Sequence, residues 1–168
     1  MIVRKLIPGM AGALGVLAML GTLSACTPAD RPLTALRYVD GRPTLLVVAC
    51  PDFQLDSLAV YPDGGPAASA STIEWQILRE SGAPPDQITL LGPPPTGWAA
   101  KQTSLTAFTP GQEYGVSAFD GADSAVPIHF TLADLEALAP GQVLVGKPAS
   151  KRKAVSESTF RDDAGDSC

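Results

Sequence analysis

Three cysteines, at positions 26, 50 and 168, are the residues of this 168-residue sequence best suited to covalent chemistry. Cys26 follows a segment that starts with Arg4 and Lys5 and then runs from residue 6 to residue 25 without a charge. A basic start followed by an uncharged stretch predicts an export signal over residues 1–25. The same stretch is long enough to span a bilayer, so a transmembrane anchor is the rival interpretation. Its several glycines, and the absence of a basic cluster directly after it, favour the signal.

The residues Leu23, Ser24, Ala25 and Cys26 resemble the lipobox of bacterial lipoproteins. In that family the cysteine thiol takes a diacylglyceryl group, and a peptidase then cuts just before it. The resemblance implies that Cys26 is the lipid attachment site and that the mature chain is anchored in the cell membrane at its extracytoplasmic face. An ordinary buried cysteine after an apolar helix is the alternative. The Ala-, Gly- and Pro-rich, Asn-free composition is similar to that of high-GC, actinobacterial proteins.

Cys50 and Cys168 remain as an even pair once Cys26 is set aside. In an oxidising compartment such a pair predicts a disulfide, which would tie the last residue of the chain to an early strand. Two free thiols, or a bond from Cys168 to another chain, are the alternatives. Since the cysteines and the single histidine form no cluster, a metal site is not predicted.

His129 is the only histidine, and any Ser/His/Asp or Cys/His site would have to use it. It alternates with Val126, Ile128 and Phe130, which predicts that it lies on the solvated face of a strand. The sequence has no Gly-x-Ser-x-Gly motif to provide a nucleophile. The Ser-x-x-Lys match at residues 150–153 is attributed to chance. Its basic triplet could contact anionic headgroups or a partner, but the favoured interpretation is a solvated face balanced by Asp162, Asp163 and Asp166. We therefore predict no catalytic residue and no cofactor.

A stiff loop that contains Pro93, Pro94, Pro95 and Trp98 is the most distinctive surface candidate. An exposed tryptophan offers a large contact area at little entropic cost, so this loop is a possible binding site for a partner or a glycan. The alternative is that Trp98 folds back and packs over the end of the domain. The Asp-rich turns, such as residues 120–123, are interpreted as turns and not as Ca²⁺ ligands.

The chain has 12 Lys and Arg against 17 Asp and Glu, a net charge of −5. An acidic chain without a basic stripe argues against nucleic-acid binding.

The polar, proline-containing residues 26–43 are predicted to form a flexible tether, and residues 44–168 a single domain with a polar C-terminal segment. Apolar and alternating runs predict strands at residues 45–50, 55–61, 73–78, 88–91, 105–108, 114–119, 126–130 and 143–145. A helix is the competitor at residues 73–78, and a short capped helix is predicted after Thr131.

The stretch Phe108 to Val116, which contains Pro110, Gly111 and Tyr114, resembles the corner between strands E and F of fibronectin type III domains. The resemblance implies a tyrosine corner at Tyr114. Trp75 and Cys50 are similar to the inter-sheet aromatic and the early cysteine of immunoglobulin-like domains. Together with the many short strands, these features predict an all-β fold: an immunoglobulin- or fibronectin III-like β-sandwich with one short helix, preceded by an N-terminal signal helix.

A small domain on a membrane anchor, without an evident catalytic group, is expected to be a non-enzymatic binding or adaptor domain for another envelope protein. The alternative is a lipoprotein that binds a cell-wall glycan or small ligand through Trp98 and neighbouring loops. An enzyme is the third and least favoured class, because a fold by itself carries no activity.

Overall fold

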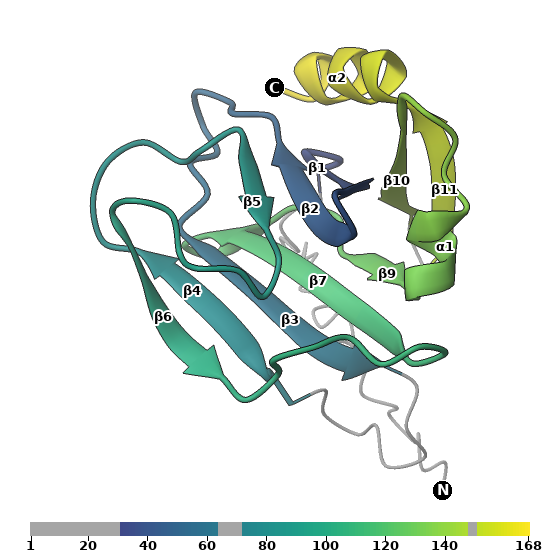
Figure 1. Cartoon of the computed structure of the whole chain (residues 1–168). Coiled ribbons are helices and arrows are strands. Elements are labelled where there is room, and N and C mark those ends of the chain that lie inside the picture. The colour runs from purple at the N-terminus through teal and green to yellow at the C-terminus, as the bar shows by residue number, and fades with distance from the viewer. Residues whose placement is uncertain (1–30, 64–71, 148–150) are drawn as a thin grey trace, which may run out of the picture.

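Two antiparallel sheets pack face to face in the computed structural model, which describes residues 31–63, 72–147 and 151–168 (Figure 1). One sheet has five strands in the order β11-β10-β1-β2-β5. The other has the order β6-β4-β3-β7-β8, with β9 also paired to β7. The strands are β1 (Thr34–Val39), β2 (Arg42–Val47), β3 (Ser57–Asp63), β4 (Trp75–Arg79), β5 (Gln87–Thr89), β6 (Trp98–Thr103), β7 (Glu113–Asp120), β8 (Asp123–Ser124), β9 (Ile128–Phe130), β10 (Gln142–Lys147) and β11 (Lys151–Ser156). The predicted all-β sandwich is confirmed.

The strand order agrees with that of an immunoglobulin-like sandwich. Strands β1, β2 and β5 lie in the positions of strands A, B and E, and strands β3, β7 and β9 lie in those of C, F and G. The hairpin β10–β11 extends the first sheet beyond β1, and β6 extends the second sheet beyond β4.

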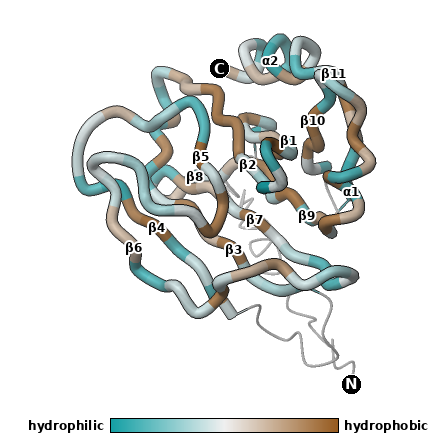
Figure 2. Tube along the Cα trace, in the orientation of Figure 1, coloured by the Kyte–Doolittle hydropathy of each residue, from teal (hydrophilic) through white to brown (hydrophobic). Residues whose placement is uncertain are grey.

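Alternating side chains from both sheets form the core. Leu58 and Val60 of β3, and Trp75 and Ile77 of β4, are almost fully buried. In β4 the residue between them, Gln76, is only half-buried. Figure 2 shows the contrast between these strands, which contain brown apolar segments, and the mainly hydrophilic C-terminal helix. This alternation is the reason why residues 73–78 form a strand and not the competing helix.

The predicted tether over residues 26–43 is wrong for its second half. Residues 34–39 form β1, and Leu33, Ala35 and Leu36 are fully buried. The signal that identifies this strand is the Asp40-Gly41 pair, which has positive φ values of 50° and 75° and joins β1 to β2 in a tight hairpin. The prolines of this region lie before β1 and at the second position of β2, so they do not prevent pairing. The start of the predicted tether, at residues 26–30, and the predicted signal helix lie outside the described residues.

The remaining strand predictions are largely confirmed, with two exceptions. Residues 105–108 do not form a strand; β6 lies instead just before them, at residues 98–103. The polar sequence of β6 lacks an apolar alternation because most of the strand is exposed at the edge of the sheet. Residues 143–145 are not the last strand, since the equally polar β11 follows and pairs with β10.

The tyrosine corner predicted at Tyr114 is present. The Thr109 N–H donates to the Tyr114 hydroxyl oxygen at 2.9 Å, five residues upstream. The buried Tyr114 ring also packs edge-to-face on Phe108, with 4.9 Å between ring centroids, and Phe108 contacts Phe130 of β9 in the same way. The corner therefore fixes the entry to β7, the strand that pairs with β3, β8 and β9.

Tyr114→Phe removes this hydrogen bond and leaves the ring in place. We expect the free energy of unfolding to fall by about 1 kcal/mol, because the Thr109 N–H loses its partner. Urea denaturation monitored by tryptophan fluorescence measures the change. Tyr38→Phe is the matched control: this tyrosine is half-buried, and no hydrogen bond of its hydroxyl occurs among the described residues, so its stability should be unchanged. Equal stabilities of the Tyr114→Phe variant and the wild type would contradict the role of the corner.

Two helices complete the domain. The short helix α1 (Leu132–Glu136) is the predicted one, with a capping box formed by Thr131 and Asp134. The C-terminal helix α2 (Glu157–Asp166) was not predicted, because residues 147–167 are polar. Its signals are the N-cap Ser156 and the i, i+4 pair Phe160 and Ala164, both of which are buried. No helix among the described residues has the length and apolarity needed to cross a membrane.

Candidate functional site

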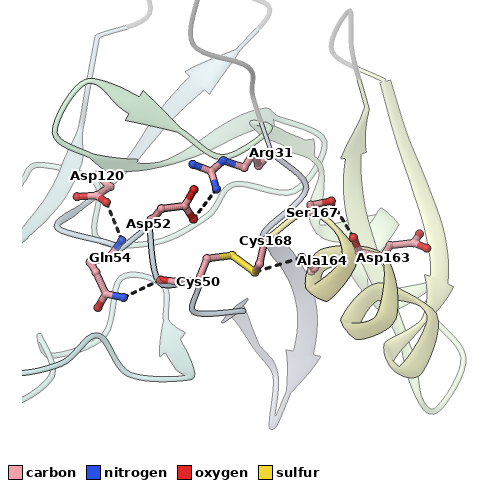
Figure 3. Close-up of a disulfide and its surroundings, with 9 residues drawn as sticks. All are labelled: Arg31, Cys50, Asp52, Gln54, Asp120, Asp163, Ala164, Ser167 and Cys168. Atoms are coloured by element: carbon pink, nitrogen blue, oxygen red, sulfur yellow. Dashed lines mark hydrogen bonds and ion pairs between the residues drawn. A yellow bond between two sulfur atoms is a disulfide. The ribbon is translucent and has the colours of Figure 1, made fainter.

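The predicted disulfide is formed within the chain. Cys50 and Cys168 are bonded across a sequence separation of 118, with their Cα atoms 5.3 Å apart (Figure 3). Cys50 follows β2, and Cys168 lies two residues after the end of α2, so the bond joins this end of the helix to the five-stranded sheet. The other end of α2 follows directly from β11, and near that end Glu157 is paired with Arg37 of β1 at 3.4 Å and with Arg161 at 2.6 Å. The C-terminal helix is thereby attached to the sheet at both ends.

Cys26, the predicted lipid attachment site, lies outside the described residues. The disulfide nevertheless shows that the other two cysteines are already bonded. The sequence has three cysteines, and two of them are bonded to each other, so Cys26 is the cysteine that remains for another reaction.

Of the two interpretations of Trp98, the structure supports packing against the domain. Trp98 begins β6 and is only 7% exposed, so its ring is not available as an exposed binding surface. The preceding Gly97 lies tightly against Ser81: a Cβ at Gly97 would be 2.4 Å from the Ser81 carbonyl oxygen. Pro93 remains exposed, and Pro94 and Pro95 are half-buried. The surface of this loop is therefore formed by prolines, and the loop is followed directly by the exposed edge strand β6.

His129 is not on a solvated face. It is 9% exposed, and its Nδ1 is bonded to an Asp63 carboxylate oxygen at the end of β3. The physical reason is the sheet order, in which β7 lies between β3 and β9 and brings Tyr61, Gly115 and His129 into one row. The Tyr61 ring lies over Gly115 and contacts the His129 ring at 6.4 Å between centroids. Sequence reasoning missed this cluster because its two halves are separated by 66 residues.

The chemistry open to this cluster is proton exchange between an imidazole and a carboxylate. Ser117 is the nearest candidate nucleophile along β7, but its hydroxyl is hydrogen-bonded to the Tyr61 hydroxyl at 3.3 Å. In the described part of the chain, no hydroxyl or thiol is hydrogen-bonded to His129. The Asp63–His129 pair thus cross-links β3 to β9 within this region.

A second polar cluster lies where α1 meets β11 and β7. Arg152 is paired with Glu113 and, at 3.1 Å, with Asp134. Burial raises the pKa of Asp134, but hydrogen bonds from the Thr131 hydroxyl and N–H, together with Arg152, outweigh it and leave the pKa below its usual value. This cluster connects the hairpin β10–β11 to the opposite sheet.

The ionised carboxylate of Asp134 stabilises the fold, so its protonation should make the domain less stable in acid. A carboxyl whose pKa is lowered by folding stabilises the fold fully above about pH 4, and the stabilisation is lost as the pH falls through the lowered folded-state pKa. Asp134→Asn should therefore cost about 1 kcal/mol at neutral pH and much less at about pH 3. Glu136→Gln is the control, because this exposed carboxyl on the same helix makes no ion pair among the described residues. Urea unfolding at several pH values tests this, and a cost that is independent of pH would contradict it.

The carboxylates in the acidic turns hold neighbouring loops in place through hydrogen bonds and an ion pair. The carboxylates of Asp120 and Asp56 accept hydrogen bonds from the Gln54 and Gly121 N–H groups, at 2.7 and 2.9 Å. Asp52 is paired with Arg31 at 2.8 Å, and its hydrogen bond from Arg31 lowers its pKa (Figure 3). Within the described ranges, no three His, Cys, Asp or Glu side chains are grouped so that they could hold a metal ion.

No protein-family model, curated protein or solved structure matches the chain.

Proposed function

We propose that this protein is an exported lipoprotein, anchored through Cys26 at the outer face of the cytoplasmic membrane, whose β-sandwich is a non-enzymatic binding or adaptor domain. The observation that carries the proposal is the Cys50–Cys168 disulfide. Structural disulfides are typical of exported proteins, and this one leaves Cys26 as the remaining thiol, at the last position of the lipobox-like sequence. Two acyl chains on Cys26 would give a stable anchor, whereas one chain binds a membrane only marginally.

The surface that we propose for partner binding is the proline loop, residues 93–95, together with β6. This strand ends the six-stranded sheet, and residues 100–103 are exposed. Among the described strands it pairs with β4 alone, so the backbone groups of its other side are free to accept an added strand. The alternative function, glycan binding through an exposed Trp98, loses its basis because this ring is buried.

Replacing Cys26 by serine in the full chain tests the anchor. We expect the variant to remain an unprocessed, unlipidated precursor, because serine has no thiol to accept the lipid. A gel-shift assay and fractionation of the cells measure both properties. Cys50→Ser is the control: it also replaces a cysteine by serine but leaves the lipobox-like sequence intact, so this variant should still be processed and bound to the membrane although it lacks the disulfide. A processed, membrane-bound Cys26→Ser protein would contradict the proposal.

Photo-crosslinking in the native cells tests the binding surface. A crosslinking amino acid at Gln102, exposed in β6, should capture one dominant envelope protein. The same group at Asp162, exposed on α2, should not. Equal capture from both positions, or no reproducible protein from Gln102, would contradict a partner at this edge.

A further inference from the structure

The hairpin β10–β11 carries most of the lysines of the exported chain. After Cys26 the sequence has four lysines, and three of them, Lys147, Lys151 and Lys153, lie on this hairpin. All three are exposed, and in the described residues none is paired with a carboxylate. By contrast, Arg152 between them is paired with both Glu113 and Asp134. The hairpin thus has a surplus of positive charge in a chain whose overall charge is negative.

The three lysines lie on one face of the hairpin. Lys147 is the direct cross-strand partner of Lys151, and Lys153 is two residues further along β11, so their side chains share a face. Arg152 points to the opposite face, toward the other sheet. Two like charges directly across an antiparallel pair repel one another. This repulsion is relieved when an anionic surface lies against the face.

The membrane anchor would hold this same end of the domain near the lipid. Ala35 is paired with Val145, so the antiparallel register of β1 and β10 leads Leu33 toward Lys147. The Val126 N–H donates to the Arg31 carbonyl at 2.8 Å, and the next residue, Pro127, lies against Gly146. The chain therefore enters the domain beside the end of β10. The five residues from Cys26 to Arg31 span at most about 18 Å, so a lipid on Cys26 keeps the end of β10 close to the membrane surface.

We infer that the face formed by Lys147, Lys151 and Lys153 docks on anionic lipid headgroups and orients the domain on the membrane. This inference rests on the proposed lipid anchor at Cys26. A polybasic surface is attracted to anionic lipid, and the attraction is felt within a Debye length of about 8 Å at physiological ionic strength. Of the acidic residues on neighbouring segments, Asp52 is paired with Arg31, and Glu157 of α2 is paired with Arg37 and Arg161. Docking at this face would leave β6, on the other side of the sandwich in Figure 1, free for a partner.

Lysine labelling tests the orientation. The full, lipidated protein is placed in vesicles of phosphatidylcholine, or of phosphatidylcholine with an equal part of phosphatidylglycerol, and treated with a membrane-impermeant amine-acetylating reagent. Mass spectrometry then quantifies each lysine. We expect the anionic lipid to slow labelling of the three hairpin lysines about fivefold. A change of this size corresponds to the attraction of a single lysine to an anionic lipid surface. Lys101 on β6 should be unaffected, and about 1 M salt, which shortens the Debye length to about 3 Å, should remove the protection.

Matched charge reversals complete the test. Lys147→Glu should abolish the protection of Lys151 by anionic lipid, whereas Lys101→Glu should leave it intact. The intact mass of the protein, measured first, separates the two proposals. An unmodified Cys26 would overturn the anchor and this docking with it. A lipidated protein whose hairpin lysines react equally in both kinds of vesicle, or are protected equally in the Lys147→Glu variant, would overturn the docking alone.

Discussion

Replacement of Cys168 by serine will lower the free energy of unfolding by about 5 kcal/mol, according to the chain-entropy model for a loop of this length. The disulfide closes a loop with a sequence separation of 118, which restricts the unfolded chain strongly. It also holds the C-terminal end of α2, a helix that contributes only two buried side chains, Phe160 and Ala164. We therefore expect the variant to be less stable and its C-terminal helix to be cleaved early by proteases.

Urea denaturation measures this loss, and the buried Trp75 and Trp98 provide the fluorescence signal. Cys50→Ser and the double variant should be destabilised by the same amount as Cys168→Ser, because each removes the same bond. Adding a reductant should lower the stability of the wild type and leave the variants unchanged. A Cys168→Ser protein as stable as the wild type would contradict a structural role for the disulfide.

The second large effect is expected at Gly146 of β10. A Cβ at this position would be 2.1 Å from the Pro127 carbonyl oxygen, so either β10 or the segment between β8 and β9 would have to shift. The obstacle is backbone, which cannot turn aside as a side chain would. Gly146→Ala should therefore cost about 3 kcal/mol, at the upper end for overpacking. Urea unfolding or the shift in Tm measures the cost.

Gly165 of α2 is the matched control for the same substitution. A Cβ there meets nothing within 4 Å, and the residue lies within a helix. Gly165→Ala should stabilise the domain by about 0.5 to 1 kcal/mol, because alanine loses less backbone entropy in a helix. Two glycine substitutions of identical chemistry should thus change stability in opposite directions. Equal effects at both positions would contradict the close approach of β10 to Pro127.

Local patterns predicted much of the fold. Alternation at Trp75 and Ile77, the capping residues Thr131 and Asp134, and the corner motif around Tyr114 each depend on neighbours within a few residues, and each is present as predicted. Among the strands that were missed, those at residues 98–103 and 151–156 are exposed edge strands. Their polar residues carry no alternation because neither face is fully covered.

The candidate sites depend on contacts between residues that are far apart in the sequence, which local sequence patterns do not show. His129 was expected to be solvated, but β3 brings Asp63 and Tyr61 to it across β7. For Trp98 the sequence left both packing and exposure open, and the structure shows the ring buried in the core. By contrast, the Cys50–Cys168 bond was predictable without any geometry, because it follows from counting the cysteines once Cys26 is set aside.

The central claim, that Cys26 anchors an exported and disulfide-bonded domain, is tested most directly by mass spectrometry of the protein purified from the membranes of its own cells. The account predicts a mature chain that begins at Cys26, carries a diacylglyceryl group on this residue, and contains the intact Cys50–Cys168 disulfide. A mature protein that retains residues 1–25, or one with an unmodified Cys26, would contradict it.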